Sequence, residues 1–217
     1  MRAAYIPPHR RMPMPRTFTE RCAAIGRRIF RQRMHVGLAA VALGALLIHP
    51  RPIFGAHQPA GAAASVALVL LGLAGRAWAG GSAGRHTREA GIGAPRLATG
   101  GPYAHVRNPI YLASIILGLG MVLLLGDLWM TALYAGVFIF LYTSIVPAEE
   151  QFLRTQFAAE YARYCAHVPR IFPRLRPWPG ARSQPFDWTA LLYEARLGLM
   201  LIAIYAGLHA AAWLRGA

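Results

Sequence analysis

The sequence predicts an all-α protein that lies in a membrane as a bundle of about five transmembrane helices. Hydrophobic residues make up 56% of the 217 residues and charged residues only 14%, whereas soluble domains carry about 25% charged residues. The apolar residues gather in long segments, and the basic residues lie between alternate segments. All 23 basic residues are arginine. Their place beside apolar segments is typical of the flanks of membrane spans and not of a nucleic-acid-binding surface.

Each apolar segment is predicted to be a helix, because backbone N–H and C=O groups find no water inside a lipid bilayer. The segments are 34–49, 60–79, 110–126, 128–147 and 189–214. The first is short for a span of about 20 residues. A long arginine-rich stretch precedes it, so a retained span is favoured over a signal peptide. Gly126, which ends the third segment, and Asp127 are the only residues at the connection to the fourth, so these two segments are expected to form a tight antiparallel hairpin.

The arginines predict the orientation in the membrane. They are abundant in residues 1–33, 80–108 and 148–188 and sparse in the alternate connections. This alternation places the N-terminus in the cytoplasm and the end of the fifth span outside. Arginine used without lysine is also typical of a GC-rich genome, so the expected location is a bacterial inner membrane.

Polar residues that are costly near a membrane occur in two stretches on the expected cytoplasmic side. The first runs from Gly100 to Tyr111. Gly100 and Gly101 predict a turn, and Pro109 suits the first position of a helix with Asn108 as its N-cap. The N–H groups and partial positive charge of a helix N-terminus suit a bound anion. The simpler interpretation is a capped span with an interfacial tyrosine.

The second stretch, 149–170, begins with two adjacent carboxylates directly after an apolar span, where charge is costly unless it is paired or solvated. Glu149 shares one helix face with Leu153, Phe157 and Tyr161, which places it toward the bundle. Glu150 and Arg154 are four residues apart, so a solvated ion pair is one interpretation of Glu150. A bound sulfonium or ammonium cation is the functional alternative for either carboxylate.

These motifs resemble the isoprenylcysteine carboxyl methyltransferase family, which is related to the phospholipid N-methyltransferases of membranes. The resemblance covers residues 76–173 and rests on patterns in the same order and at similar spacing. The patterns are Gly101-Pro102-Tyr103, Val106-Arg107-Asn108-Pro109-Ile110-Tyr111, Glu149-Glu150 and Val168-Pro169-Arg170. Asn108 stands where that family usually has histidine, and the more distantly similar phosphatidylethanolamine methyltransferases have asparagine there.

The resemblance implies transfer of a methyl group from S-adenosylmethionine to a lipid or lipidated acceptor, at either a carboxylate or an amine. The residues implied to bind the cofactor are Leu97, Thr99, Tyr103, Asn108, Pro109, Ile110, Tyr111 and Glu150. Those implied in catalysis are Glu149, Glu150 and Arg170, and those implied to hold an anionic substrate group are Arg107 and Arg170. A carboxylate acceptor needs no base, whereas an amine must lose a proton to a carboxylate, a tyrosine or His105. A lone interfacial histidine such as His105 is more often structural.

The expected organisation has three parts: an arginine- and proline-rich cytoplasmic tail at 1–33, a membrane methyltransferase core at 34–173, and a proline-rich linker with a C-terminal transmembrane helix at 174–217. The expected partners are the lipid bilayer and a lipid-like substrate, without nucleic acid. The two cysteines lack the spacing of a metal site, so no metal is expected. Two other functions stay open: a membrane NADPH-dependent sterol or enone reductase, and a non-catalytic membrane scaffold.

Overall fold

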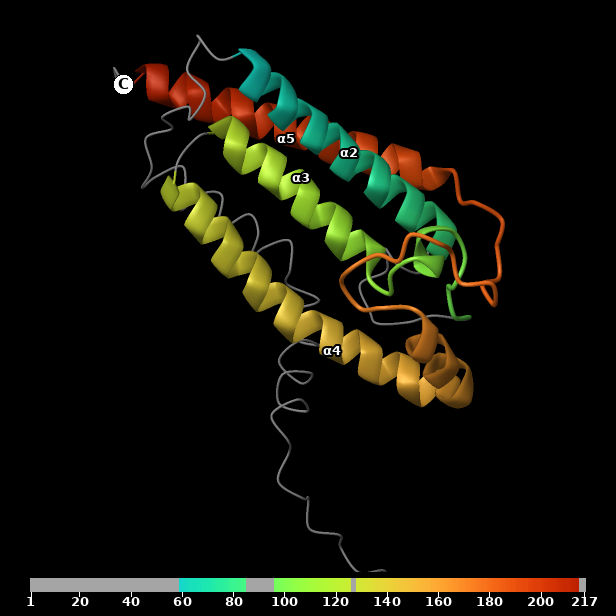
Figure 1. The fold of residues 1–217 in the computed structure, drawn as a ribbon. Coiled ribbons are helices and arrows are strands. Elements are labelled where there is room, and N and C mark those ends of the chain that lie inside the picture. Colours follow the sequence, from blue (N-terminus) through green and yellow to red (C-terminus); the bar gives the residue numbers. More distant parts are fainter. Residues whose placement is uncertain (1–58, 85–95, 126–127, 215–217) are drawn as a thin grey trace, which may run out of the picture.

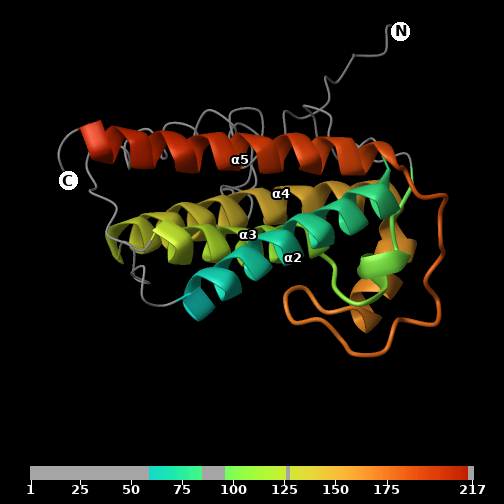
Figure 2. The ribbon, with the colours of Figure 1, turned by 90° about the horizontal axis from the view of Figure 1, so that it is seen from above.

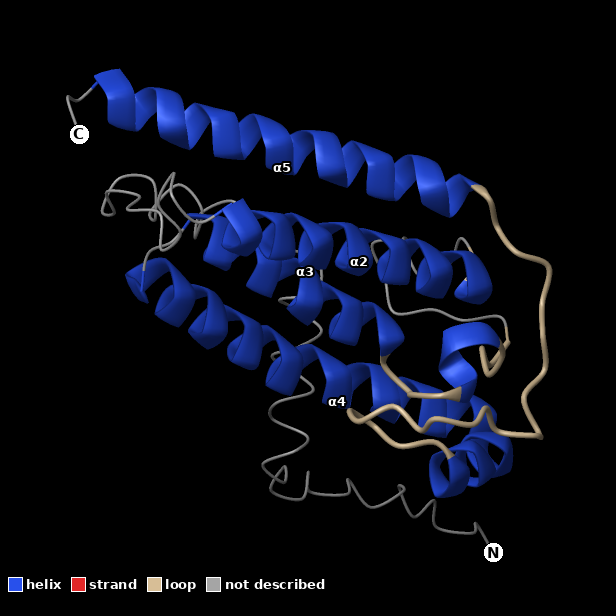
Figure 3. Ribbon diagram, turned by 45° about the horizontal axis from the view of Figure 1, so that its top comes forward, coloured by secondary structure: helices blue, strands red, loops and turns tan. Residues whose placement is uncertain are grey.

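The computed structural model describes residues 59–84, 96–125 and 128–214, which form a helical bundle (Figure 1). Its elements are α2 (Pro59–Ala83), the short 3-10 helix η2 (Gly101–Ala104), α3 (Pro109–Leu125), α4 (Leu128–His167) and α5 (Thr189–Leu214). No strand occurs among the described residues (Figure 3), which confirms the all-α prediction. The expected tail at 1–33 and the expected span at 34–49 lie outside the described residues.

Helix α2 packs against both α3 and α5, and α3 in turn contacts α4. The long helices run side by side, with α5 along α2 (Figures 1 and 2). Small residues let α2 and α3 approach closely, because a Cβ atom on Gly120 would lie 2.7 Å from the carbonyl oxygen of Ser65. Close approach through small residues is a common way for helices to associate inside lipid.

Among the described helices, three are long and apolar enough to cross a membrane, over Ala60–Ala83, Thr131–His167 and Thr189–Gly207. The 17 residues of α3 would extend about 26 Å, slightly less than the ~30 Å hydrocarbon core of a bilayer. Exposed leucines on α2 and α5, such as Leu70 and Leu199, suit contact with lipid tails. These features support a membrane protein, while the count of five spans and the tight hairpin stay predictions.

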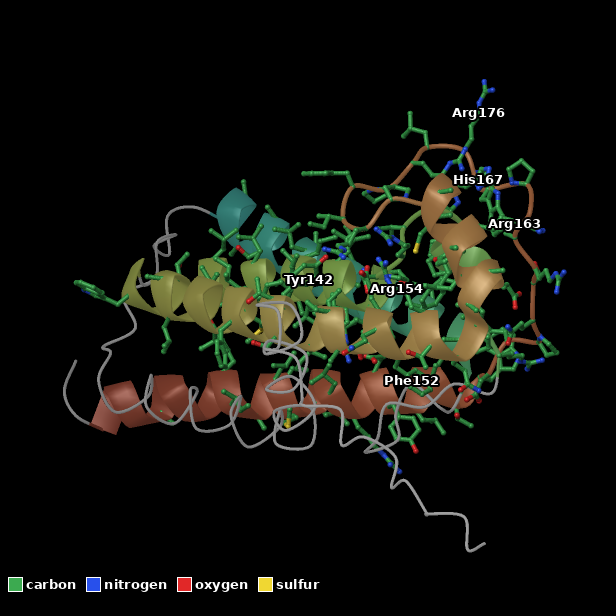
Figure 4. All side chains as sticks on the ribbon, turned by 90° about the horizontal axis from the view of Figure 1, so that it is seen from below. Tyr142, Phe152, Arg154, Arg163, His167 and Arg176 are labelled. Carbon is green, nitrogen blue, oxygen red and sulfur yellow. The ribbon has the colours of Figure 1, made fainter. Side chains whose placement is uncertain are left out.

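Helix α4 is longer than the expected span at 128–147, because it continues through Pro147. Proline removes a backbone donor and usually kinks or ends a helix, but the next residue, Ala148, is buried, and this packing outweighs the local preference. The helix breaks instead at Ala158, whose φ of 33° and ψ of −106° are not helical. The last part of α4 therefore turns back toward the bundle and carries Arg163 (Figure 4).

Candidate active site

The two polar stretches lie side by side at one end of the bundle. The chain before α3 runs along the chain after α4, and the loop after α4 passes beside the first turn of α3 (Figure 1). The bonds between them join Arg107 N to Pro169 O at 2.9 Å, Arg174 N to His105 O at 3.0 Å, Trp178 N to Ala104 O at 2.9 Å, and Asn108 Nδ2 to Arg170 O at 3.3 Å. The segment before α3 and the loop after α4 therefore meet where α3 begins.

Glycines make the turn before α3 possible. Gly101 has a φ of 59°, in the left-handed region that favours glycine. A Cβ atom on Gly100 would lie 2.5 Å from the carbonyl oxygen of Arg182, so the linker to α5 closes over this turn. Arg182 N also donates to the Thr99 hydroxyl at 3.0 Å. The predicted turn is confirmed, and the linker holds it in place.

Glu150 lies at the centre of a cluster of arginines. Its side chain is 5% exposed, and it accepts two hydrogen bonds from Arg170, one from Nε to Oε1 at 2.9 Å and one from Nη2 to Oε2. Arg107 Nη1 lies 3.5 Å from Oε1. The expected pair with Arg154 is present at 3.8 Å, but Arg154 is 64% exposed and water screens it. Interpreting Glu150 as a solvated carboxylate is therefore wrong, because the group is buried.

Arg107 enters this cluster from the segment just before α3. Its Nη1 donates to Cys165 Sγ at 2.9 Å. Its Nε is buried and has no hydrogen-bond partner among the described residues. Burial lowers the pKa of Arg107, but the nearby Glu150 carboxylate and Cys165 raise it by more, so the guanidinium stays charged. The hydrogen bond to Glu150 likewise raises the pKa of Arg170.

Glu149 makes a different contact from its neighbour. Tyr111 Oη donates to Glu149 Oε1 at 3.0 Å, and the Tyr111 ring packs edge-on against Tyr142 with ring centroids 5.8 Å apart. Tyr142 Oη is buried and has no hydrogen-bond partner among the described residues. The more buried carboxylate is Glu150, whereas the sequence pattern favoured Glu149.

The sequence pattern missed Tyr142, although a signal for it exists. Tyr142, the buried Val146 and Glu150 recur at every fourth position of α4 and so share one helix face. Cys165 was also missed, because nothing in the sequence around it indicates a contact with Arg107, 58 positions away. Only the turn of the chain at Ala158 brings that part of α4 back to the site.

The other residues implied in cofactor binding lie around this cluster in two layers. Asn108 contacts the backbone of Arg170, and Pro109 opens α3 as predicted. Ile110 follows in the first turn of α3, where its carbonyl accepts a bond from Ser114. Tyr103 precedes them, and burial together with nearby Glu149 raises its pKa above the usual range.

Leu97 and Thr99 lie in the second layer. Leu97 belongs to a buried apolar cluster with three residues near the end of α4, namely Tyr161, Tyr164 and Val168. Thr99 is buried and bonded to the linker. The structure therefore gives both residues packing contacts, and their roles toward a cofactor stay predictions.

His105 is held by the linker and not by the acidic residues. Its Nδ1 donates to the carbonyl oxygen of Arg174 at 2.8 Å, since a carbonyl can only accept. Its own carbonyl accepts from Arg174 N. These reciprocal bonds support the structural interpretation of His105. Within the described residues, no three His, Cys, Asp or Glu side chains gather in a way that could hold a metal ion.

The segment that carries Arg107, Tyr142 and Glu150 is similar to proteins of known families. Residues 60–160 match the phospholipid methyltransferase family. The matched residues include α2, η2, α3 and most of α4, so the resemblance that the motifs predicted is confirmed. The linker and α5 lie outside the match. With the apolar helices, the match supports a membrane methyltransferase.

Three curated proteins are similar to parts of this chain, which spans well under half the length of each. A protein-S-isoprenylcysteine O-methyltransferase of Schizosaccharomyces pombe is 35% identical over 77 residues. The cobalt-zinc-cadmium resistance protein CzcN of Cupriavidus metallidurans is 33% identical over 93 residues, and the nickel-cobalt-cadmium resistance protein NccN of Alcaligenes xylosoxydans xylosoxydans is 29% identical over 79 residues. The matches cover 36%, 43% and 36% of this chain and 33%, 41% and 37% of the respective relatives. No solved structure matches the chain.

Proposed function

We propose that the protein transfers a methyl group from S-adenosylmethionine to a carboxylate, or a similar oxygen anion, on a lipid-like acceptor. The observation that carries this proposal is a pair of unpartnered donors at the site, Arg107 Nε and Tyr142 Oη. A buried donor without a partner is costly. An acceptor group that takes hydrogen bonds from both would relieve that cost, whereas an ammonium group would not.

The charges of the cluster also favour an anionic acceptor. Glu150 balances one positive charge, while Arg107 and Arg170 both lie within 4 Å of it, in addition to the exposed, water-screened Arg154. The surplus positive charge suits a carboxylate, which guanidinium groups bind with paired hydrogen bonds. In this proposal the two arginines hold the acceptor, and Glu150 fixes their orientation.

A carboxylate acceptor fits the groups that could serve as a base. It is ionised at neutral pH and needs no proton removed, whereas an amine would need a base. Both oxygens of Glu150 are taken by Arg170. Tyr103 stays protonated at neutral pH, because its pKa is raised by burial and by Glu149. His105 is tied to the Arg174 carbonyl. Positioning alone can then supply much of the acceleration.

The residues at the start of α3 fit S-adenosylmethionine, which supplies an electrophilic methyl group on a sulfonium centre. Glu149 offers negative charge for its cationic groups, and Tyr111 fixes that carboxylate. The first N–H groups of α3 offer the positive end of a helix for its carboxylate. We assign the cofactor to this side of the cluster, with Asn108 and Tyr111 as the nearest contacts and Leu97 and Thr99 as packing behind them.

We further propose that this site faces the cytoplasm of a bacterial cell, at the inner membrane. The loops at the site end of the bundle carry most of the described arginines outside the helices, and the positive-inside rule favours such loops in the cytoplasm. Five spans with the N-terminus inside fit this orientation. The polar cofactor would arrive from water, and the acceptor would enter sideways from the lipid.

Ligand binding and turnover separate this proposal from its rivals. Calorimetry on detergent-purified protein would compare S-adenosylmethionine, its demethylated product and NADPH. Transfer of a labelled methyl group would then be followed to a prenylated thioether acid, the matching primary amide and phosphatidylethanolamine. We expect micromolar binding of the S-adenosyl ligands and labelling of the acid but not of the amide.

Each rival predicts another result. Binding of NADPH without S-adenosyl ligands would indicate the sterol or enone reductase. Folded protein that binds none of these ligands, with or without the acid present, would indicate a scaffold. Preferential labelling of phosphatidylethanolamine would keep the enzyme class and refute the oxygen acceptor.

A further inference from the structure

A short segment of the loop after α4 carries large apolar side chains that are exposed on the surface. Leu175 is 97% exposed and Phe172 is 82% exposed, and Ile171 beside them is exposed as well. Arginines flank these residues at positions 170, 174 and 176. We call residues 171–176 the loop tip. Apolar side chains at such exposure are unfavourable in water unless another surface covers them.

Hydrogen bonds place the loop tip at the level where α3 begins. Four hydrogen bonds join the loop to residues 104–108, just before α3. They pair Trp178 with Ala104, Arg174 with His105, Pro169 with Arg107, and Arg170 with Asn108. The loop tip therefore lies beside the first turn of α3, which is the predicted membrane edge of the third span (Figure 3).

Only some of the apolar side chains of this loop point outward. The same loop buries Trp178 partly, stacking it on His167 with ring centroids 5.4 Å apart. Arg174 Nη1 donates to the His167 carbonyl at 3.0 Å, which fixes the loop further. A loop held by this many contacts cannot easily fold Phe172 and Leu175 inward. Apolar side chains between arginines at a membrane edge are typical of segments that lie in the lipid interface.

We propose that the loop tip is an interfacial anchor that binds anionic phospholipid headgroups of the leaflet on the site side. Phe172 and Leu175 enter the boundary between headgroups and acyl chains, and the exposed Arg176 faces the phosphates. This inference rests on the membrane location of the chain and not on methyl transfer.

Charge on this end of the molecule favours anionic lipid over zwitterionic lipid. Exposed arginines lie in or beside the loop tip at positions 170 and 176, and Figure 4 shows Arg176 on this end of the bundle. The exposed Glu160 lies near Arg182, with 3.9 Å between the charged atoms, so it offsets little of that charge. Basic groups at a membrane surface attract anionic headgroups over about a Debye length. Lipid gathered at the loop tip would lie one residue from Arg170, which reaches Glu150.

Photocrosslinking in nanodiscs tests the anchor. Full-length protein with Leu175→benzoylphenylalanine would be placed in discs of phosphatidylcholine and phosphatidylglycerol at about 7:3, and crosslinked lipid measured by mass spectrometry. Arg163→benzoylphenylalanine, an exposed position on the part of α4 that turns back, is the water-facing control. Leu199→benzoylphenylalanine, on the outside of α5, is the lipid-facing control.

We expect lipid crosslinking at position 175 to approach that at 199 and to exceed that at 163 by about fivefold or more. The phosphatidylglycerol share of that lipid should exceed its share in the disc and fall toward it in Arg176→Gln. Equal crosslinking at 175 and 163 would overturn the anchor, and an unchanged lipid share in folded Arg176→Gln would overturn the headgroup preference. Neither readout depends on cofactor or turnover, so the methyltransferase proposal can fail separately.

Discussion

Among the described residues, two arginine–carboxylate groups with largely buried carboxylates differ in how completely their hydrogen bonds are made. Inside the bundle, Arg76 of α2 uses all three of its guanidinium nitrogens. Nε and Nη2 donate to Glu194 of α5 at 2.8 and 3.1 Å, and Nη1 donates to Ser114 of α3 at 2.6 Å. Tyr134 of α4 completes this group by donating to the Ser114 carbonyl at 2.8 Å.

At the end of the bundle, the group around Glu150 is incomplete. Arg107 Nε and Tyr142 Oη are buried without partners among the described residues. The comparison teaches that full pairing marks a group that holds helices together, while unused buried donors mark a group that can receive a ligand. Tyr134 and Tyr142, on the same helix, provide a matched pair for testing this distinction.

The largest effect is expected from breaking the complete group. Arg76→Leu would leave the Glu194 carboxylate unpaired among apolar helices, which should lower the free energy of unfolding by about 3 kcal/mol. Arg76→Leu with Glu194→Leu should recover most of that loss, because no charge is then left alone. Thermal unfolding in detergent measures both variants. If the double variant were as unstable as the single variant, the loss of stability would not come from the unpaired Glu194 carboxylate.

Removing the central carboxylate of the incomplete group should act on activity more than on stability. In Glu150→Gln, Arg107 and Arg170 lose the charge that orients them, and we expect kcat/KM to fall about 100-fold, equivalent to ~2.7 kcal/mol. The matched change Glu194→Gln should instead lower the unfolding temperature. Methyl transfer and thermal unfolding would be measured for both. If both variants lost activity and thermal stability to the same extent, the proposed difference between the two groups would be wrong.

The tyrosine pair gives the sharpest test. Tyr142→Phe removes an unpartnered hydroxyl, so stability should stay constant or rise slightly, while transfer to an oxygen acceptor falls about tenfold. Tyr134→Phe removes a made hydrogen bond, so it should lower the free energy of unfolding by about 1 kcal/mol with little change in turnover. If Tyr142→Phe retained full activity toward the acid, its hydroxyl would not bind the acceptor.

The smallest effect is expected at the exposed third arginine. Arg154 lies 3.8 Å from Glu150 but is 64% exposed, so Arg154→Gln should change stability by less than about 0.5 kcal/mol. Its effect on kcat/KM should be within about twofold and should vanish at high salt. A loss as large as that of Glu150→Gln would place Arg154 within the site.

Local patterns predicted the helices that the structure describes and the turn before α3, but not the contacts within the candidate site. The turn at Gly100 and Gly101 and the start of α3 at Pro109 follow from the backbone preferences of single residues, so the sequence was sufficient there. The burial of Glu150 depends on Arg170, twenty positions away in the chain. A helical periodicity drawn from 149–161 carries no information on that partner.

Other features of the structure depend on contacts between residues that are far apart in the sequence, so a short sequence segment cannot predict them. The ion pair of Arg76 with Glu194 joins residues 118 positions apart. The path of α4 through Pro147 and its break at Ala158 go against the local preferences of both residues, because packing after the helix decides them. For the same reason the role of Cys165 beside Arg107 could not be read from its surroundings in the sequence.

The ion pair between α2 and α5 also affects the order of steps in folding, because it can form only after α5 has been synthesised. Arg76 leaves the ribosome 118 residues before its counter-charge Glu194. Until α5 is made, the inserted α2 carries an unbalanced guanidinium that must stay near the membrane surface. The arrival of α5 then lets α2 settle against its neighbours. A nascent chain interrupted before α5 would therefore keep the Arg76 guanidinium without the carboxylate that balances it in the complete bundle.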